Sequence, residues 1–477
     1  MMVSGAGAGG RGGGEAGRPS PGGEDTAFFG HPRGLGYLAG TELWERFSFY
    51  GMQSLLMLYM TKYLLLPSVA GDVAGLAGFR AALGAIVGPM SDLAFAAQTF
   101  GLYSGFMMVV PLIGSWLGDR VIGRTKTVTL GAVLMAAGHL AMAIEQAFLL
   151  ALVLLILGGG CLIGNLAAQV GSLYAPEDSR RTRAFGLYLV ALNIGAFASP
   201  IIVGTLGERV AWRWGFAAAG IGMMLGLLVY LCGRRHLPAQ IMIRGGAGKR
   251  LGRAQWITIG ALAITMVPRI FAIAAAKQAY SIMLVWADGS VDRHVGPWEV
   301  PVTWIMSVDG MMTIIGILLV GMLWARLGRR GLEPSDVRKI GIGNLMVAAA
   351  FLMIGLMAQL AKVPLLGWLG FYLLLDLSYA WWDPPGKALI SRFAPASVNG
   401  TMFAASNLAT AGGFFLLGYL GRYYEALGPS FYFLMTALLP IVGGLFMILF
   451  ARSLLRLLET ADREGAGDVA APHLARG

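Results

Sequence analysis

The chain has 477 residues, of which 57% are hydrophobic and only 13% are charged, and its mean hydropathy is +0.68. This composition excludes an ordinary soluble domain and is typical of a polytopic helical membrane protein. The net charge of +11 does not indicate nucleic-acid binding, because the basic residues lie in short clusters between apolar runs. That pattern is typical of cytoplasmic loops. We therefore expect contact with the lipid bilayer and none with nucleic acid.

The chain begins with a Gly-rich polar segment. Residues 1–35 contain no apolar stretch of the kind found in a signal peptide, so we expect a disordered tail. About twelve apolar runs follow, and each is long enough to cross a bilayer as a helix. They lie near residues 37–64, 96–117, 127–146, 148–173, 184–206, 213–233, 256–284, 299–325, 340–360, 364–391, 397–421 and 429–455. The sequence thus predicts an all-α polytopic membrane protein.

The connections between these runs alternate in charge. The basic set lies at residues 120–126, 180–183, 234–253, 326–339, 387–392 and 452–456. Basic loops stay on the cytoplasmic side, so we expect a multi-pass protein of the inner (plasma) membrane with both termini cytoplasmic. The other connections are poorer in basic residues, and the longest of them, 66–93, has room for a short surface helix.

The basic stretch at residues 234–254 divides the chain into two parts. We expect an N-terminal six-helix bundle over 36–233, a cytoplasmic linker over 234–254, a C-terminal six-helix bundle over 255–456 and a C-terminal tail over 457–477. Two similar six-span halves with a site between them at the middle of the membrane describe a secondary transporter. We expect it to act as a monomer.

The first span carries charges, in the stretch TELWERFSFYGM at 41–52. Helical spacing puts Glu42, Glu45 and Arg46 on one face, with Tyr50 one turn further along. A charge at the middle of a membrane costs about 3 kcal/mol on insertion scales unless it faces a partner or water. The stripe should therefore face the bundle interior. A carboxyl group there can alternate between its charged and neutral forms beside an arginine, although a static ion-pair cluster would look the same.

A second polar stripe lies in the tenth span, where tyrosine and aspartate alternate at spacings of four, three and four residues. Its members are Tyr372, Asp376, Tyr379 and Asp383. Two prolines follow directly, and we expect them to break the helix. Trp382, beside this stripe, is suited to stacking on an aromatic group of a substrate.

Nothing in the sequence indicates an enzyme. The five histidines are scattered, the two cysteines show no metal or redox spacing, and no Ser/Lys or zinc signature occurs. We therefore expect no catalytic residue, no metal site and no cofactor other than the proton as coupling ion.

Several stretches resemble known transporters. GSWLGDRVIGR at 114–124 resembles the signature loop of the major facilitator superfamily, in which ion pairs join helix ends, with Asp119 a candidate partner for an arginine. FFGHPRGLGYLAGTELWERFSFYG at 28–51 resembles the opening of the proton-coupled oligopeptide transporter family, whose first helix carries Glu-x-x-Glu-Arg-Phe. LYLVALNIGAF at 187–197, WEVPVTWIMSV at 298–308 and RFAPASVNGTM at 392–402 resemble further stretches of that family.

The resemblance implies the major facilitator superfamily fold, with about twelve transmembrane helices in two six-helix halves. It also implies proton-coupled symport of small peptides or peptide-like, zwitterionic metabolites by alternating access. In the family, the stripe that corresponds to Glu42, Glu45 and Arg46 takes part in proton coupling and in binding a peptide carboxylate.

The sequence departs from the family at several charged positions. The lysine of the family's fourth helix is Ile163, and the acid before Gln278 in the seventh helix is Lys277. The family's eighth-helix asparagine is Asp309. In the tenth helix the family's glutamate falls on Tyr379 and a serine becomes Asp383. A cation has thus moved from helix 4 to helix 7, and acids have moved onto helices 8 and 10. This exchange makes an ordinary dipeptide and tripeptide site doubtful, and it leaves Arg46 as the remaining basic partner of Glu42 and Glu45 for proton coupling.

From these comparisons we expect ten residues to contact the substrate. They are Arg46, Tyr50, Asn165, Asn193, Lys277, Gln278, Asp309, Tyr379, Trp382 and Asp383. For Asn193, a plain helix-packing role is an equal alternative.

Lys277 has two interpretations. It either pairs with Asp309 or Asp383 as a lock between helices, or it joins Arg46 in holding an anionic substrate group while Asp383 or Asp376 takes a cationic one. Arg269, two turns before Lys277, is expected to reach towards the cytoplasmic edge. Three other functions fit the same fold: transport of a non-peptide metabolite, export, and nutrient sensing without transport.

Overall fold

The computed structural model describes residues 25–175, 177–238, 251–395 and 397–470, with backbone only for 462–470. The described chain is almost entirely helical, which confirms the predicted fold class. Within these ranges, eight helical segments are long and apolar enough to cross a membrane, and one of them covers two predicted spans. Most of the predicted N-terminal tail, the middle of the predicted linker and the last seven residues lie outside the described ranges.

The first half of the chain runs from α1 to α9. Its elements are α1 (Arg33–Tyr59) with the π-helical turn η1 (Met60–Leu64), α2 (Pro67–Ala70), α3 (Leu76–Val87), α4 (Asp92–Arg120), α5 (Arg124–Ala141), η2 (Glu145–Ala147), α6 (Phe148–Ser172), α7 (Arg180–Ser199), η3 (Pro200–Gly204), α8 (Thr205–Arg209), α9 (Trp212–Gly233) and η4 (Arg234–His236). The first helix thus includes the last three residues of the predicted tail. The surface helix expected within 66–93 is α3.

The second half contains α10 (Arg253–Ala276), the 3-10 turn η5 (Lys277–Tyr280), α11 (Ile282–Ser290), η6 (Val302–Trp304), α12 (Ile305–Arg329), α13 (Asp336–Met357), α14 (Leu365–Phe393), α15 (Asn399–Leu420), η7 (Gly421–Tyr423), α16 (Tyr424–Leu449) and α17 (Ala451–Ala470). Short strands join the helix ends: β1 (Val291–Asp292) pairs in parallel with β4 (Val363–Pro364), and β2 (His294–Val295) pairs antiparallel with β3 (Trp298–Glu299). The segment predicted as the C-terminal tail is helical as far as residue 470.

Two helices, α14 and α16, contain residues that commonly interrupt a helix. The prediction of a break at Pro384 and Pro385 is wrong, since both lie inside the continuous helix α14. A proline removes only its own N–H bond, and packing against neighbouring helices holds a membrane helix together around it. In α16 the chain does turn, at Gly428, where φ is 73°. The last predicted span starts at the following residue.

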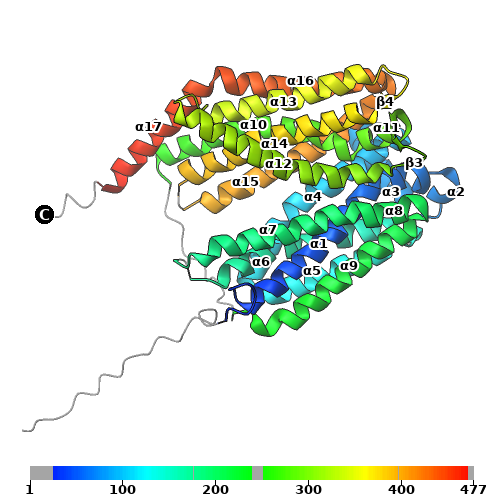
Figure 1. The fold of residues 1–477 in the computed structure, drawn as a ribbon, viewed down its shortest axis with the longest axis horizontal. Coiled ribbons are helices and arrows are strands. Elements are labelled where there is room, and N and C mark those ends of the chain that lie inside the picture. The colour runs from blue at the N-terminus through cyan, green and yellow to red at the C-terminus, as the bar shows by residue number, and fades with distance from the viewer. Residues whose placement is uncertain (1–24, 176, 239–250, 396, 471–477) are drawn as a thin grey trace, which may run out of the picture.

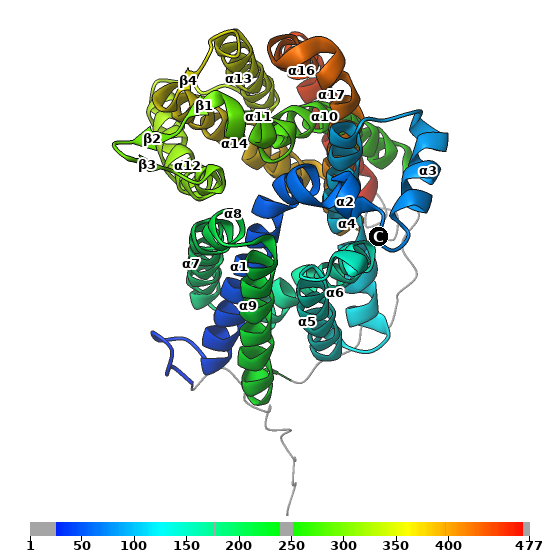
Figure 2. The same cartoon turned by 90° about the vertical axis from the view of Figure 1, so that its right-hand side faces the viewer.

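The two halves lie side by side with their long helices roughly aligned (Figure 1). One end of the molecule carries α2, α3 and the short strands, which face the viewer in Figure 2. The beginning of α10 and the end of α12 lie at the opposite end (Figure 1). We call the end with α2 and α3 the outer end.

Small residues let the helices approach closely. A Cβ atom added at Gly114 of α4 would overlap the carbonyl oxygen of Gly160 in α6, and one at Gly195 of α7 would overlap the carbonyl oxygen of Leu43 in α1. Lipid gives apolar helices little reason to associate, so close packing of backbones holds them together. The contact at Gly195 fixes α1 against α7 within one turn of the charged stripe.

Candidate functional site

The charged stripe of α1 forms a compact buried group, which we call the first-helix cluster: Glu42, Glu45, Arg46 and Tyr188. The Nε of Arg46 donates to Glu42 Oε1 at 2.9 Å and lies 2.7 Å from Glu45 Oε2. The hydroxyl of Tyr188, from α7, donates to the other oxygen of Glu42. The helical spacing therefore does bring the three charges together on one face.

Glu45 stands out within the first-helix cluster. Its side chain is fully buried, and among the described residues neither of its oxygens has a hydrogen-bond donor in good geometry, although Arg46 is close to one of them. One arginine faces two carboxyl groups, so the cluster carries a net charge of −1 when both are ionised. A buried charge without full compensation is unfavourable. A proton on Glu45 would remove it.

Tyr50 connects this cluster to the second half of the chain. It lies one turn beyond Arg46 on α1 and is close enough to interact electrostatically both with Arg46 and with Asp309 of α12. Tyr379 of α14 and Tyr280 of η5 are also within range of Tyr50. The two predicted polar stripes, on α1 and on α14, therefore face a common region between the halves.

Asp309 and Asp376 lie together on the second-half side, and we call them the α12–α14 carboxyl pair. Their carboxyl groups are within hydrogen-bonding reach of each other. The Tyr280 hydroxyl donates to Asp309, and the Thr313 hydroxyl donates to Asp376 Oδ1 at 2.8 Å. Asp376 belongs to the predicted stripe, whereas no local pattern indicated Tyr280 or Thr313.

Asp383 has two basic partners. It accepts from Arg269 Nη1 at 2.6 Å and from Lys387 Nζ at 2.7 Å, and the Tyr379 hydroxyl donates to it at 2.9 Å. The expectation that Arg269 reaches towards the cytoplasmic edge is wrong: only 13% of its side chain is exposed, and its guanidinium lies over the Trp382 ring at 5.2 Å. The 114-residue separation between Arg269 and Asp383 gives no local signal of this pair.

Lys277 is therefore not the partner of Asp383. It lies in the turn η5, with its Nζ 4.5 Å from the centre of the Tyr280 ring. It is close enough to Asp309 to interact with it electrostatically, yet within the described ranges it makes no ion pair of 4.0 Å or less. Lys277 thus faces Asp309 without being locked to it by a short ion pair.

Three predicted substrate contacts have other partners. Asn165, which is 1% exposed, donates to the carbonyl oxygen of Gly114 at 2.9 Å and so joins α6 to α4. Gln278 donates to the carbonyl oxygen of Leu417 at 3.4 Å, and Asn193 bonds to the backbone of its own helix. Asn165 and Gln278 thus join neighbouring helices, while the bond of Asn193 stays within α7. A polar residue in a span satisfies a neighbouring backbone as readily as a ligand.

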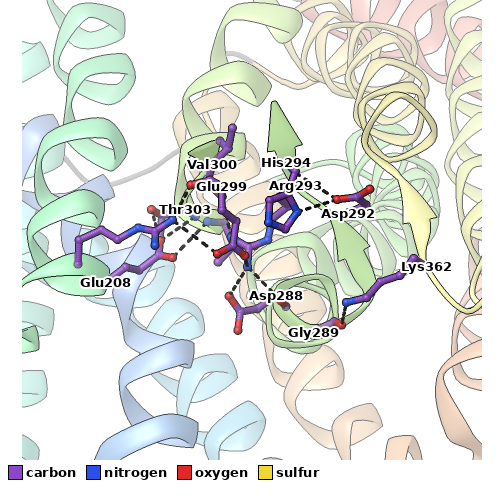
Figure 3. A network of polar contacts seen from close by, with 12 residues as sticks. Glu208, Asp288, Gly289, Asp292, Arg293, His294, Glu299, Val300, Thr303 and Lys362 are labelled. Carbon is purple, nitrogen blue, oxygen red and sulfur yellow. Dashed lines mark hydrogen bonds and ion pairs between the residues drawn. The ribbon is translucent and has the colours of Figure 1, made fainter. Parts of the chain in front are cut away.

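At the outer end, polar contacts hold the two halves together (Figure 3). The carboxylate of Glu208, in α8, accepts from the backbone N–H groups of Val302 and Thr303 at 3.2 and 3.0 Å and from the Thr303 hydroxyl at 2.5 Å. It thereby caps the beginning of the α12 segment across the boundary between the halves. Figure 3 also shows buried Arg293 between Asp288 of α11 and Glu299 of β3, so that its guanidinium joins these two elements.

In the described part of the chain, every ion pair between the halves lies at this outer end: Lys62 with Asp288, and Arg209 with Glu299. The Ser307 hydroxyl adds a hydrogen bond to the carbonyl oxygen of Phe197 at 2.6 Å. The structure is therefore closed on the side of α2 and α3.

At the opposite end, the predicted ion pair of the signature loop is present. Arg124 Nε donates to Asp119 Oδ1 at 2.8 Å and joins the end of α4 to the start of α5. Within the described ranges, no three His, Cys, Asp or Glu side chains are arranged to hold a metal ion.

Comparison with known proteins gives a consistent result. The family model described as the POT family matches residues 125–263 and 254–425. An uncharacterized transporter, YclF, of Bacillus subtilis is 28% identical over 88% of this chain and 94% of its own length. A di-/tripeptide transporter of Lactococcus lactis subsp. cremoris is 26% identical over 91% of this chain and 98% of its own length.

Solved structures agree on the fold. A peptide transporter POT in complex with sulfate superimposes with a TM-score of 0.80 and 24% identity, covering 90% of this chain and 96% of that chain. A POT family transporter in complex with 5-aminolevulinic acid gives a TM-score of 0.75 and 21% identity, covering 90% and 98%. Since the family model covers well over half of the sequence, the chain belongs to the POT family of transporters.

Proposed function

We propose that this protein is a proton-coupled symporter that takes up small peptides or peptide-like, zwitterionic metabolites by alternating access. The observation that carries the proposal is the first-helix cluster, in which one buried arginine is shared by two buried carboxyl groups. Membership of the POT family and the names of its relatives, among them a di-/tripeptide transporter, support the substrate class.

The charge balance of the cluster suggests how a proton and a substrate are linked. With both carboxyl groups ionised, Arg46 is held between Glu42 and Glu45, and its positive charge is already compensated, so it binds a substrate carboxylate weakly. A proton on Glu45 removes one of its two partners, and the guanidinium can then bind a substrate carboxylate with paired N–H groups. Release of the proton restores the ion pair and weakens the hold on the substrate. Proton and substrate therefore favour each other's binding.

The remaining groups suggest how a zwitterionic substrate is oriented. Arg46 and Lys277 are the cations proposed to hold its anionic end, since Lys277 makes no short ion pair within the described residues. Asp383 already faces two cations, so we assign the substrate's amino group to the neighbourhood of Asp309, which faces Tyr50. The hydroxyls of Tyr50 and Tyr379 remain candidates for further substrate contacts.

We also propose that both termini lie in the cytoplasm and that the protein acts as a monomer in the plasma membrane. The basic residues at the end of α4, the beginning of α7 and the end of α12 lie on the side opposite to α2 and α3, which supports this orientation. Attachment of a membrane-impermeant reagent to a cysteine introduced near residue 86, in α3, tests it in intact cells.

The transport proposal is tested with purified protein in proteoliposomes. Uptake of dialanine, trialanine, 5-aminolevulinic acid and a mixed metabolite pool is measured with and without an inward proton gradient, and counterflow is measured without one. The variant is Glu45→Gln, which keeps the shape of the side chain and removes its proton exchange. Asp292→Asn, at the exposed outer end, is the matched control.

Gradient-driven uptake of dialanine that is lost in Glu45→Gln, while counterflow persists and Asp292→Asn is unaffected, supports a peptide symporter. Uptake of a pool component in place of dialanine would move the assignment to a non-peptide metabolite, in line with the rearranged charges at Lys277 and Tyr379. Substrate binding without flux would overturn transport altogether.

A further inference from the structure

The α12–α14 carboxyl pair is a second acidic group in the interior, separate from the first-helix cluster. It lies in the other half of the chain, and its two members come from different helices. Asp376 is 4% exposed, and its Oδ2 has no hydrogen-bond donor among the described residues. A carboxylate oxygen buried without a donor is costly, so this oxygen needs a partner.

The geometry shows where that partner belongs. The donors around the pair are already directed to other oxygens: Thr313 bonds to Asp376 Oδ1 at 2.8 Å, and Tyr280 bonds to Asp309 Oδ2. The two carboxyl groups are nevertheless within hydrogen-bonding reach of each other. Two carboxylates are acceptors only, and one of them must carry a proton before they can form a hydrogen bond.

The charges around the pair favour a single proton. Lys277 is the cation that interacts with both aspartates, and the other titratable groups that face them are the hydroxyls of Tyr50 and Tyr372 in addition to Tyr280. These hydroxyls are neutral, so two ionised aspartates and one lysine leave a net charge of −1 in a buried region. One bound proton makes the group neutral. Two carboxyl groups this close do not both ionise readily.

We propose that Asp309 and Asp376 share one proton and form a second proton-binding site of this transporter. On binding, a proton from water forms an O–H bond with one carboxylate, and that O–H donates to the other carboxylate. On release, the O–H bond breaks, the proton returns to water, and both carboxylates are left negative beside Lys277. Binding of this proton is independent of the proposed function, whereas its part in transport rests on that function.

Loss of the proton acts on the outer closure. Asp309 lies on α12 half a turn after Ser307, which bonds across to α7, while Asp376 is on α14. Repulsion between two carboxylates pushes α12 from α14 at the level where α12 also contacts the first half. The site thus links its charge to the contacts that hold the outer end closed.

The proposal is tested by infrared difference spectroscopy of the purified full-length protein, without substrate, on a pH step from acid to alkaline. A protonated carboxyl group has a C=O stretching band that a carboxylate lacks. The variants are Asp376→Asn and Asp309→Asn, because either one removes the shared site, and Asp292→Asn is the exposed control. Proton release on the same step is measured with a pH-indicator dye.

We expect each aspartate variant to lose the same carboxylic-acid band and to release one proton fewer per protein, while Asp292→Asn retains the band. If one variant fails to fold, the other decides the result. Thr313→Val keeps both carboxyl groups and removes the donor to Asp376, so it should shift the frequency of the band. An unchanged band and an unchanged proton count in both aspartate variants would overturn the proposal.

These measurements do not depend on transport. A normal infrared result together with no peptide uptake would leave the second proton site intact and remove the proposed function. Gradient-driven uptake that depends on Glu45, together with unchanged infrared bands in Asp309→Asn and Asp376→Asn, would do the reverse.

Discussion

Removing the carboxylate of Glu208 should loosen the closed outer end. In Glu208→Ala, the N–H groups of Val302 and Thr303 and the Thr303 hydroxyl lose their acceptor across the boundary between the halves. A hydrogen bond to a charged group contributes about 1.5–3 kcal/mol when taken singly. Because water replaces part of this at the surface, we expect a total loss of about 2–3 kcal/mol. That corresponds to a roughly 30- to 150-fold shift of the equilibrium towards opening.

The shift is measured as a distance distribution between two spin labels at the outer end, one in each half. Val210 and Val295 are suitable positions, because they are 63% and 57% exposed and lie in the first and second halves. The native cysteines, buried Cys161 and exposed Cys232, are first replaced. We expect a single short distance for the unmodified protein and an added longer component in Glu208→Ala.

Glu145→Ala is the matched control. Glu145 is also a carboxylate at the outer end, but it accepts from the Tyr63 hydroxyl at 2.9 Å within the first half. Its removal should leave the distance distribution unchanged. An unchanged distribution in Glu208→Ala, or the same change in both variants, would refute the reasoning that Glu208 acts by joining the halves.

Three further predictions concern the interior and the inner end. Arg269→Met leaves Asp383 buried beside Lys387 alone, and breaking a buried pair costs about 3 kcal/mol. We therefore expect a lower melting temperature, which should be partly restored in the double variant Arg269→Met/Asp383→Asn. Additive losses from the two substitutions would contradict the pairing. Gly114→Val forces α4 away from the backbone of α6 and should destabilise the protein by about 1–3 kcal/mol, whereas Gly186→Ala, where an added Cβ meets nothing within 4 Å, should be tolerated in the same thermal assay. Burial, followed by the positive charge of nearby arginines, lowers the pKa of His31 below its ordinary value. The stability that neutral His31 contributes is therefore complete above about pH 6.5 and is lost as the pH falls towards the lowered pKa. His31→Phe should flatten the acid side of a plot of melting temperature against pH. An unchanged slope would show that another group is responsible.

The sequence predicted the spans well because a span is a local property. About twenty consecutive apolar residues determine a membrane helix almost regardless of what lies beside it. The same holds for the stripe of α1, since helical periodicity alone puts Glu42, Glu45 and Arg46 on one face. The error at Pro384 and Pro385 shows the limit of local signals, because neighbouring helices hold α14 continuous through both prolines.

Partners across helices were not predictable in this way. Periodicity fixes which residues share a face, but not the rotation of one helix against another or which side chain reaches it. Arg269 with Asp383, and Tyr188 with Glu42, are joined over 114 and 146 residues of sequence. The bond from Asn165 to the α4 backbone had no local signal either, since it depends on how closely α6 approaches α4 at Gly114.

By itself, therefore, the sequence determined the class of the protein, its spans and the position of a charged stripe on the first helix. Only the tertiary structure decided which charges face one another: Arg46 between two glutamates, Asp383 between two cations, and Asp309 beside Asp376 and Lys277. The physical reason is that the energy of a buried charge depends on atoms a few ångströms away in space. In a helix bundle, those atoms belong to segments far away along the chain.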